Sequence, residues 1–242
     1  MNDTIARKFY KKVRVLCWIM TGPKNLDTKA TAIKLTWAKR CNKFIFFSSV
    51  TNKTFPTVGL NVSEGRQHLT AKTVQAFLYC YVHYGKHFDW FVKADDDTYI
   101  IAENLRYFLS FQNPNEQIYF GFKFRTHVKQ GYFSGGAGYV LSKKALQKFA
   151  SVGLRNPFIC RQDGGAEDAE VGKCMAKLQI IAGDSLDGFG CCSQYTISFH
   201  YVNPSDMYLL DFLLYHIRPH GLHSSEKVQA AFKHYRDLSE IE

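Results

Sequence analysis

Short apolar runs alternate along the chain with stretches in which apolar residues recur at helical spacing. The runs at 13–20, 44–47, 89–94 and 118–122 have the length of buried strands. Helical spacing occurs between them, at 30–38, 67–84 and 105–111. Because strands that alternate with helices usually form a parallel sheet, the pattern predicts an α/β fold with a mixed, mostly parallel central sheet.

The second half of the chain predicts fewer strands and more irregular backbone. The segment 132–141 is interrupted by three glycines, which indicates a strand or hairpin whose backbone approaches another group closely. Further elements are expected as a helix at 166–178 that begins with acidic residues, a strand at 197–202, a helix at 204–217 and a polar helix at 226–236. We therefore expect a polar segment at 1–12, one Rossmann-like domain at 13–222 and a helical tail at 223–242.

The composition agrees with one domain and leaves several kinds of partner open. The chain has 242 residues, 46% of them hydrophobic, which is enough to bury a core. Its 31 lysines and arginines exceed its 21 acidic residues and give a net charge of +10, which suits nucleic acid, anionic membranes or phosphate-bearing substrates. No basic run has the length of a nucleic-acid-binding tail, and no base-stacking motif occurs, so nucleic acid is not an expected partner.

Cysteines and glycosylation motifs favour a secretory compartment. The chain has seven cysteines and Asn-x-Ser/Thr motifs at Asn2, Asn52 and Asn61. An odd number of cysteines leaves at least one outside internal bridges, and Cys80, on an apolar helix, is the expected buried thiol. Since no apolar run approaches the ~20 residues of a membrane span, any membrane anchor is expected outside this chain.

Three adjacent acids, Asp95, Asp96 and Asp97, follow directly after the strand expected at 89–94. Ligands of open α/β sheets bind beyond the carboxyl ends of the strands, so the position suits a site. Adjacent carboxylates repel each other unless a cation compensates, and hard oxygen ligands suit Mn²⁺ or Mg²⁺. From the triplet alone, a solvated acidic loop is an equal alternative.

Longer motifs place the triplet in a family. FVKADDDTY at 91–99 resembles the metal motif of the β1,3-glycosyltransferase superfamily. Further segments resemble, in the same order, the core 1 β1,3-galactosyltransferases of that superfamily: CWIMTGP (17–23), TWAKRCNK (36–43), VKQGY (128–132), SGGAGYVLS (134–142) and CCS (191–193). The resemblance covers roughly residues 13 to 222. It implies a GT-A glycosyltransferase fold and transfer of galactose from UDP-galactose to the 3-hydroxyl of GalNAc on a glycoprotein serine or threonine.

The resemblance also implies metal ligands and a base. Asp95 and Asp97 match the metal-binding acids, and His200 matches the distant histidine ligand, with Mn²⁺ expected and Mg²⁺ as an alternative. An inverting transfer needs a carboxylate to deprotonate the acceptor, and in AEDAEVG (166–172) the residue that matches the general base is Asp168. Glu167 and Glu170 are the fallback candidates for the base. The alternative is that these acids only complement the helix dipole.

Donor contacts follow from the same resemblance. Arg66, after Gly65, and Lys72 match positions whose cations would neutralise the diphosphate, although surface charge is a near-equal alternative. Met20 and Thr21 are expected near the uridine, whereas Asp95 and Tyr201 are expected beside the donor.

The resemblance further implies two disulfides, Cys17 with Cys41 and Cys160 with Cys174. Cys191 and Cys192 are left unassigned. A Golgi-lumenal domain of a type II membrane protein, forming a homodimer, is also expected from the resemblance.

The chain departs from the family pattern at one point. Between GDSLD (183–187) and GCCS (190–193) the family has a long aromatic-rich stretch, of which only Gly188 and Phe189 remain here. That stretch is expected to help form the acceptor side. Three alternatives follow: an active β1,3-galactosyltransferase, a related transferase with another acceptor, and an inactive paralogue that binds UDP and metal or acts as a partner or chaperone of its active relative.

Overall fold

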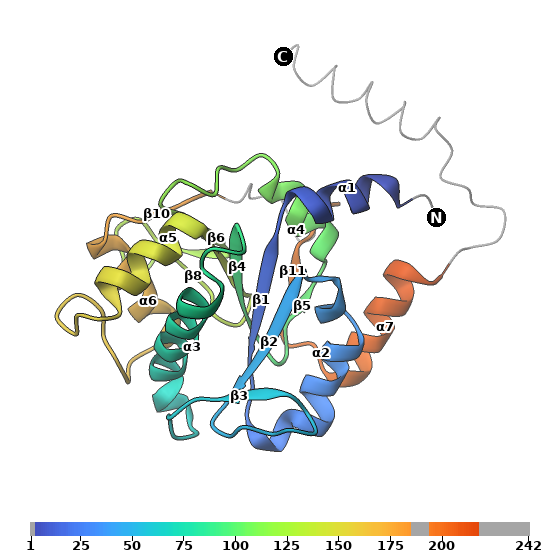
Figure 1. Cartoon of the computed structure of the whole chain (residues 1–242), viewed down its shortest axis with the longest axis horizontal. Coiled ribbons are helices and arrows are strands. Elements are labelled where there is room, and N and C mark those ends of the chain that lie inside the picture. Colours follow the sequence, from blue (N-terminus) through green and yellow to red (C-terminus); the bar gives the residue numbers. More distant parts are fainter. Residues whose placement is uncertain (1–2, 185–193, 218–242) are drawn as a thin grey trace, which may run out of the picture. The chain divides into compact units, whose positions relative to one another are not determined.

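A seven-stranded sheet forms the centre of the fold. The computed structural model describes residues 3–184 and 194–217. From one edge to the other, the strands of the sheet are β10 (Ile181–Ala182), β6 (Ile118–Gly121), β9 (Tyr139–Ser142), β4 (Trp90–Asp95), β1 (Val15–Met20), β2 (Lys43–Ser48) and β3 (Thr57–Gly59), as Figure 1 shows.

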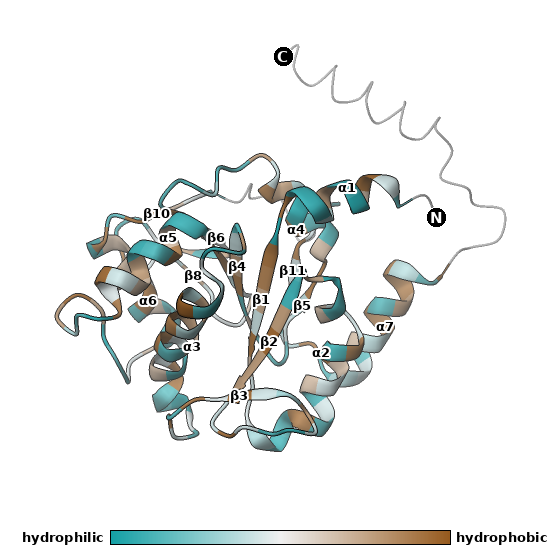
Figure 2. Cartoon of the chain, viewed as in Figure 1, coloured by the Kyte–Doolittle hydropathy of each residue, from teal (hydrophilic) through white to brown (hydrophobic). Residues whose placement is uncertain are grey.

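The strand pairing confirms the predicted mixed, mostly parallel sheet. β1 pairs in parallel with β2 and β4, β2 with β3, and β6 with β10. Only β9 runs antiparallel to its neighbours β4 and β6. All six residues of β1 are buried, and the central strands are the most apolar part of the fold in Figure 2. The parallel register sets Met20 beside Asp95, so the carboxyl ends of β1 and β4 meet.

Helices α3 (Leu69–Tyr84), α5 (Lys143–Lys148) and α6 (Glu167–Lys177) pack together on one face of the sheet. The Trp18 ring of β1 lies edge-on to Phe77 of α3, with ring centroids 5.0 Å apart, and to Phe47 of β2 at 5.8 Å. Edge-to-face aromatic contacts of this kind add to the stabilisation from apolar burial. Cys80 of α3 belongs to the same core, where burial raises the pKa of its thiol.

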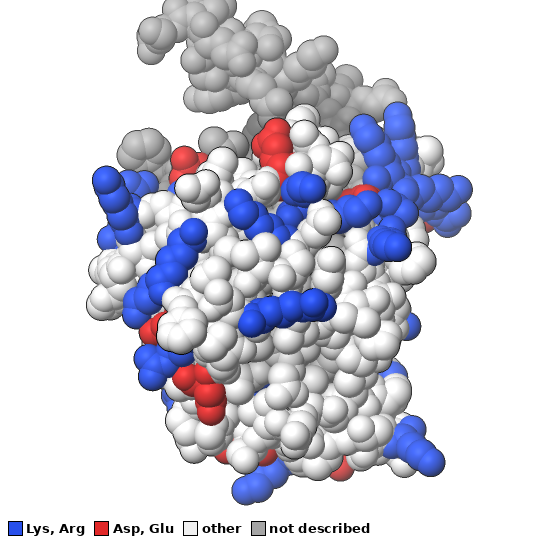
Figure 3. Space-filling view, turned by 60° about the vertical axis from the view of Figure 1, so that its left-hand side comes forward, with Lys and Arg blue, Asp and Glu red and all other residues white. Residues whose placement is uncertain are grey.

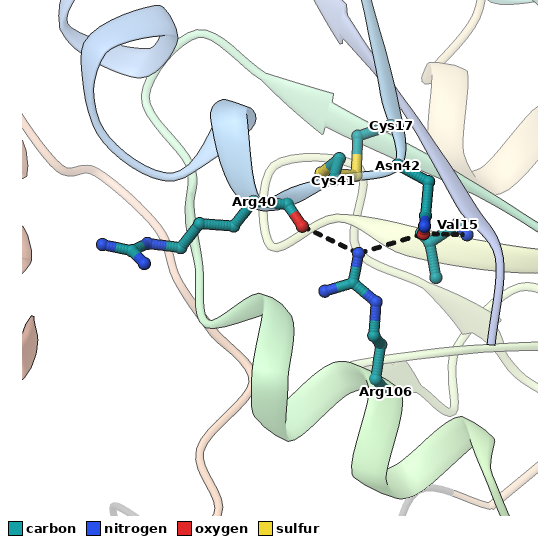
Figure 4. The surroundings of a disulfide bond; sticks show 6 residues. All are labelled: Val15, Cys17, Arg40, Cys41, Asn42 and Arg106. Carbon is teal, nitrogen blue, oxygen red and sulfur yellow. Dashed lines mark hydrogen bonds between the residues drawn. A yellow bond between two sulfur atoms is a disulfide. The ribbon is translucent and has the colours of Figure 1, made fainter. Parts of the chain in front are cut away.

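On β1, Cys17 points to the face opposite Trp18, because successive strand residues alternate. Cys17 is bonded to Cys41, as Figure 4 shows. Arg106 of α4 (Ala102–Leu109) is 3% exposed, and its Nη2 donates to the carbonyl of Arg40 at 2.7 Å and to Oδ1 of Asn42 at 3.0 Å. The disulfide and the guanidinium thus fasten the segment before β2 to both β1 and α4.

The structure also has a helix that the sequence analysis did not predict, α1 (Thr4–Lys12), within the segment expected to be merely polar. Arg7 Nε donates to Asp3 Oδ2 at 2.7 Å along the helix. The Phe9 ring lies 6.2 Å from that of Tyr107 on α4. The Arg106 guanidinium lies 4.7 Å from the centroid of the Tyr10 ring, so Phe9 and Tyr10 both connect this helix to the domain.

Two predicted elements differ from those observed. The helix expected at 30–38 is limited to α2 (Thr31–Leu35), preceded by a π-helical turn at Leu26–Ala30. The hydroxyl of Thr36 donates to the carbonyl of Ala32 at 2.7 Å, and such back-bonding by threonine bends helices.

The prediction of a hairpin at 132–141 is wrong. β8 (Tyr132–Phe133) pairs with β7 (Lys123–Phe124), whereas β9 joins the main sheet, so the glycines form a turn between two sheets. The strand expected at 197–202 is limited to β11 (Ser198–Phe199), which pairs with β5 (Tyr99–Ile100).

The chain divides into compact units at 1–208 and 209–242, and α7 (Pro204–Tyr215) spans the division. The domain end predicted at 222 and the helix predicted at 226–236 lie outside the described residues. Among the helices that the structure describes, none combines the length and the apolar character needed to cross a membrane.

Basic side chains are spread over the surface, as the sequence suggested. Figure 3 shows them scattered over one face and outnumbering the acidic ones there. Three basic side chains of the described residues are instead buried, Lys72, Lys93 and Arg106, with 2% to 3% exposure. Arg106 fastens the segment before β2, and the other two lie beside acidic residues at the ends of β1 and β4.

The expected disulfides Cys17–Cys41 and Cys160–Cys174 are confirmed, whereas Cys191 and Cys192 lie outside the described residues.

The Cys17–Cys41 bridge spans 24 positions. Replacing both cysteines by alanine should lower the free energy of unfolding by about 2–4 kcal/mol, because the unfolded chain regains loop entropy. Urea unfolding measures this, with Cys80→Ala as the control for losing a buried sulfur. A loss no larger than that of the control would contradict a stabilising bridge.

Candidate active site

Three aspartates at the carboxyl end of β4 bind different partners. Asp95 is the last residue of β4, and its Oδ1 accepts a hydrogen bond from Lys93 Nζ at 2.5 Å. Asp96 is directed toward the segment that follows β1, whereas Asp97 lies beside His200. The triplet is therefore not one cluster, and each carboxylate has its own part in the site.

Asp96 is the buried member, at 9% exposure. Its Oδ2 accepts from Thr21 Oγ1 and from Asn25 Nδ2, both at 2.8 Å, and its Oδ1 lies 3.4 Å from Lys29 Nζ. Thr21, predicted near the uridine, thus uses its hydroxyl to hold Asp96. Asn25 and Lys29 had no predicted role. These bonds fix the turn that presents Asp95 and Asp97.

Asp97 and His200, both predicted metal ligands, are brought together from distant parts of the chain. His200 Nε2 lies 3.5 Å from Asp97 Oδ1, and the backbone of Val202 donates to the Asp97 carbonyl at 2.9 Å. The His200 ring packs on Gly136, where an added Cβ would lie 2.0 Å from the imidazole Cε1. A side chain at position 136 would therefore displace the histidine.

The electrostatics of Asp97 suit a cation. Burial raises the pKa of Asp97, and the charges of Asp95 and Asp96 raise it further, against the lowering by His200 and Lys29. A carboxylate oxygen and an imidazole nitrogen are suitable donors for Mn²⁺. In the part of the chain that the structure describes, no three His, Cys, Asp or Glu side chains form a ready metal site. Asp97 and His200 are the two predicted ligands that the structure brings together, whereas Oδ1 of Asp95, the third predicted ligand, accepts from Lys93.

Lys93 is a further site residue that sequence reasoning missed. Its side chain is 2% exposed within β4, and Nζ donates to Asp95 Oδ1 and, at 2.9 Å, to the carbonyl of Gly135. Burial acts to lower the pKa of Lys93, but the charges of Asp95 and Glu167 raise it above its ordinary value. The available signal was a lysine inside an otherwise apolar strand, which needs a partner when buried.

Of the three candidate bases, Asp168 is placed differently from the others. It lies in the first turn of α6 and is half-buried. Its Oδ2 accepts from the backbone amide of Gly135 at 3.2 Å, and its Oδ1 accepts from that of Ala169 at 2.8 Å. Backbone amides thus orient this carboxylate while leaving it accessible.

The two fallback candidates are engaged in other contacts. Glu167 is 7% exposed, and its Oε1 accepts from Thr73 Oγ1 and Tyr139 Oη, both at 2.8 Å. Burial raises the pKa of Glu167 although Lys93 lowers it. Glu170 accepts from Lys173 at 2.8 Å and has 12% side-chain exposure. Neither arrangement favours taking a proton from a substrate hydroxyl.

Two of the predicted donor contacts lie near the end of β1. Lys72 is 3% exposed and donates to Glu64 Oε2 at 2.6 Å and to the carbonyl of Thr21 at 3.5 Å. Burial acts to raise the pKa of Glu64, but the hydrogen bonds from Lys72 and Ser49 lower it overall. Met20 is 6% exposed at the end of the strand. Lys72 therefore supports this strand end and is already paired.

Arg66 and Tyr201, two further predicted donor contacts, are on the surface. Arg66 is exposed, in the turn after Gly65, whose φ of 130° suits glycine. The Tyr201 ring is 83% exposed and stacks on His200, with centroids 3.8 Å apart, and its backbone has a φ of 61°. Such a backbone is uncommon for an aromatic residue. Their contacts with a nucleotide stay predictions.

Comparison with known proteins identifies relatives of the chain. It is similar to glycoprotein-N-acetylgalactosamine 3-beta-galactosyltransferase 1 of Xenopus laevis, with 42% identity over 258 positions that cover 91% of this chain and 71% of the relative. The alignment is longer than the 242 residues of the chain, so the relative has residues that this chain lacks. Such a length difference is what the expected missing stretch between Asp187 and Cys191 would produce. That part of the chain lies outside the described residues.

Two further relatives are more distant. Mouse beta-1,3-glucosyltransferase is 25% identical over 86% of this chain, and human chondroitin sulfate glucuronyltransferase is 27% identical over 79%. The chain spans 40% and 24% of their lengths. The model of the Fringe-like family matches residues 11–189, which include β1, the aspartate triplet and Asp168. The chain therefore belongs to the Fringe-like family and has its GT-A glycosyltransferase fold.

Proposed function

We propose that the chain transfers galactose, with inversion, from UDP-galactose to the 3-hydroxyl of GalNAc linked to serine or threonine. The observation that carries the proposal is the meeting of Asp97 with His200 beside the carboxyl end of β4, which is linked through Lys93 and Gly135 to Asp168. The name of the Xenopus relative, at 42% identity, supports the choice of sugar and acceptor.

Asp168 acts as the general base in this proposal. Its carboxylate takes the proton of the acceptor 3-hydroxyl, and the oxygen then attacks C1 of galactose on the face opposite UDP. The bond from C1 to the diphosphate oxygen breaks, and its electron pair leaves with UDP. The amides of Gly135 and Ala169 hold the two carboxylate oxygens in place during the step, which is the kind of orientation on which general-base catalysis depends.

Asp95, Asp97 and His200 would hold a divalent cation, Mn²⁺ or Mg²⁺, next to the diphosphate. When bound, the cation supplies positive charge at the leaving group. Arg66, exposed after Gly65, is free to approach the same diphosphate, and Lys72 fixes the loop beside Thr21 through Glu64. Met20, Asp95 and Tyr201 complete the predicted donor contacts.

We place the protein in the Golgi lumen, as the lumenal domain of a type II membrane protein. The two disulfides and the motifs at Asn52 and Asn61 support an oxidising secretory compartment. A homodimer, and association with a chaperone or an active paralogue, are proposed from the family resemblance.

The experiment that tests the function is Mn²⁺-dependent sugar transfer to a GalNAc-threonine peptide. UDP-galactose is compared with UDP-glucose and UDP-glucuronate, and UDP binding is measured by calorimetry on the same sample. Turnover with UDP-galactose alone is the expected result. UDP binding without turnover would overturn transfer to GalNAc and favour either a transferase with another acceptor or the inactive paralogue.

Asp97→Asn should weaken Mn²⁺-dependent UDP binding at least ~10-fold, because an amide is a poorer ligand for a hard cation than a carboxylate. Asp89→Asn is the matched control. Asp89 lies just before β4, at the opposite end of the strand from Asp97, and its side chain is paired with Arg14, so UDP affinity should stay within ~3-fold. Equal losses of affinity in both variants would contradict the assignment of Asp97.

Asp168→Asn should reduce kcat by ~10²–10⁴-fold, the usual contribution of a general base, with UDP affinity retained. Glu170→Gln is its control, since Glu170 is paired with Lys173 on the same helix and should keep kcat within ~3-fold. Steady-state kinetics and calorimetry measure the two effects. Retained turnover in Asp168→Asn would show that another group takes the proton.

A further inference from the structure

One charged group links the two sides of the site but takes no part in the chemical steps proposed above. The ammonium of Lys93 is buried within β4, where it donates to Asp95 Oδ1 at 2.5 Å and to the Gly135 carbonyl at 2.9 Å, with Glu167 Oε2 at 3.9 Å. A buried ammonium costs folding free energy unless oxygen atoms surround it. Three oxygens from three separate segments do so here, which means that Lys93 fixes their relative positions.

Gly135 links Lys93 to the candidate base. Its carbonyl accepts from Lys93, and its amide donates to Asp168 Oδ2 at 3.2 Å. Both peptide groups flank the same Cα, so only the two backbone dihedrals of Gly135 separate them. A movement of the carbonyl therefore changes the direction of the amide that holds Asp168.

The packing around Gly135 leaves little freedom for such movement. A Cβ added at this position would lie 2.6 Å from Glu167 Oε2 and 3.3 Å from Lys93 Nζ. Glu167 is itself held from its other oxygen by Thr73 and Tyr139. The glycine thus lies in a narrow space with Lys93 and Glu167 on its Cβ side.

We propose that Lys93 is a positioning residue for the transfer reaction, because it fixes the direction of the Asp168 carboxylate through Gly135 and holds Asp95 at the same time. The inference rests on the proposed role of Asp168 as the base. A single ammonium then sets the geometry between the donor side at the end of β4 and the acceptor side at the start of α6.

A double-mutant cycle tests the link between Lys93 and Gly135. Lys93→Met keeps the unbranched apolar stem and removes the charge, and it should lower kcat by ~10–100-fold because small misplacements of a base are costly. The kcat should fall by a larger factor than the KM for UDP-galactose rises, since the base loses its orientation while Asp95 loses one of its contacts. Gly135→Ala should cause a similar loss of kcat.

In the double variant, the loss of kcat should exceed the larger single loss by no more than ~3-fold, because both changes break the same link. Losses that multiply would show that Lys93 and Gly135 act independently and would overturn the proposal. A change confined to the KM for UDP-galactose would also overturn it, because Lys93 would then act only on the donor side.

Hydrogen exchange at the Gly135 amide gives a readout that needs no turnover. In Lys93→Met this amide should exchange at least ~10-fold faster, while amides of β1 keep their protection. Unchanged exchange at Gly135 would overturn the proposal. If the wild-type protein transferred no galactose, the proposed function would fail, and exchange would still decide whether Lys93 holds the Gly135–Asp168 contact.

Lys93→Met leaves the Glu167 carboxylate buried without its nearby cation, so this variant can unfold. Lys93→Met/Glu167→Gln removes both charges, and the amide oxygen of Gln can still accept from Thr73 and Tyr139. If Lys93→Met/Glu167→Gln folds and has a low kcat, the result supports positioning by Lys93. Recovery of wild-type kcat would show that only charge balance was needed and would overturn the proposal.

Discussion

The parallel pairing of β1 with β4 is the constraint on which the site depends. The register sets Met20 beside Asp95, so the next residue, Thr21, can hold Asp96 across the strand ends. Both strands are buried on both faces, so a shift by one residue would exchange the side chains that pack on the two faces of the sheet. The position of the carboxylates therefore depends on the packing of the strands that carry and flank them.

Much of the fold could be predicted because it follows from local patterns in the sequence. The strand at 89–94 matches β4, the helix at 67–84 matches α3, and the acidic helix at 166–178 matches α6 to within a few residues. Each has a periodicity or an apolar run that only one kind of element satisfies. The meeting of Asp97 with His200 was anticipated only through the family resemblance, because no local pattern joins residues so far apart.

What could not be predicted depends on three-dimensional contacts between polar groups. The role of Lys93 could not be predicted, because its partners Gly135 and Glu167 come from other segments. Asn25 has no sequence signal that distinguishes it from an ordinary loop residue, although it holds Asp96. The pattern at 132–141 predicts one strand or a hairpin, because the sequence does not determine which strands its two halves pair with.

The turn at Gly135 and Gly136 limits which side chains this part of the site can accept. His200 packs against one glycine, while Glu167 and Lys93 close around the other. The turn contributes to the site through its backbone alone, so its chemistry cannot be altered by exchanging side chains within it. Any change of substrate that leaves this turn intact must therefore come from side chains outside it.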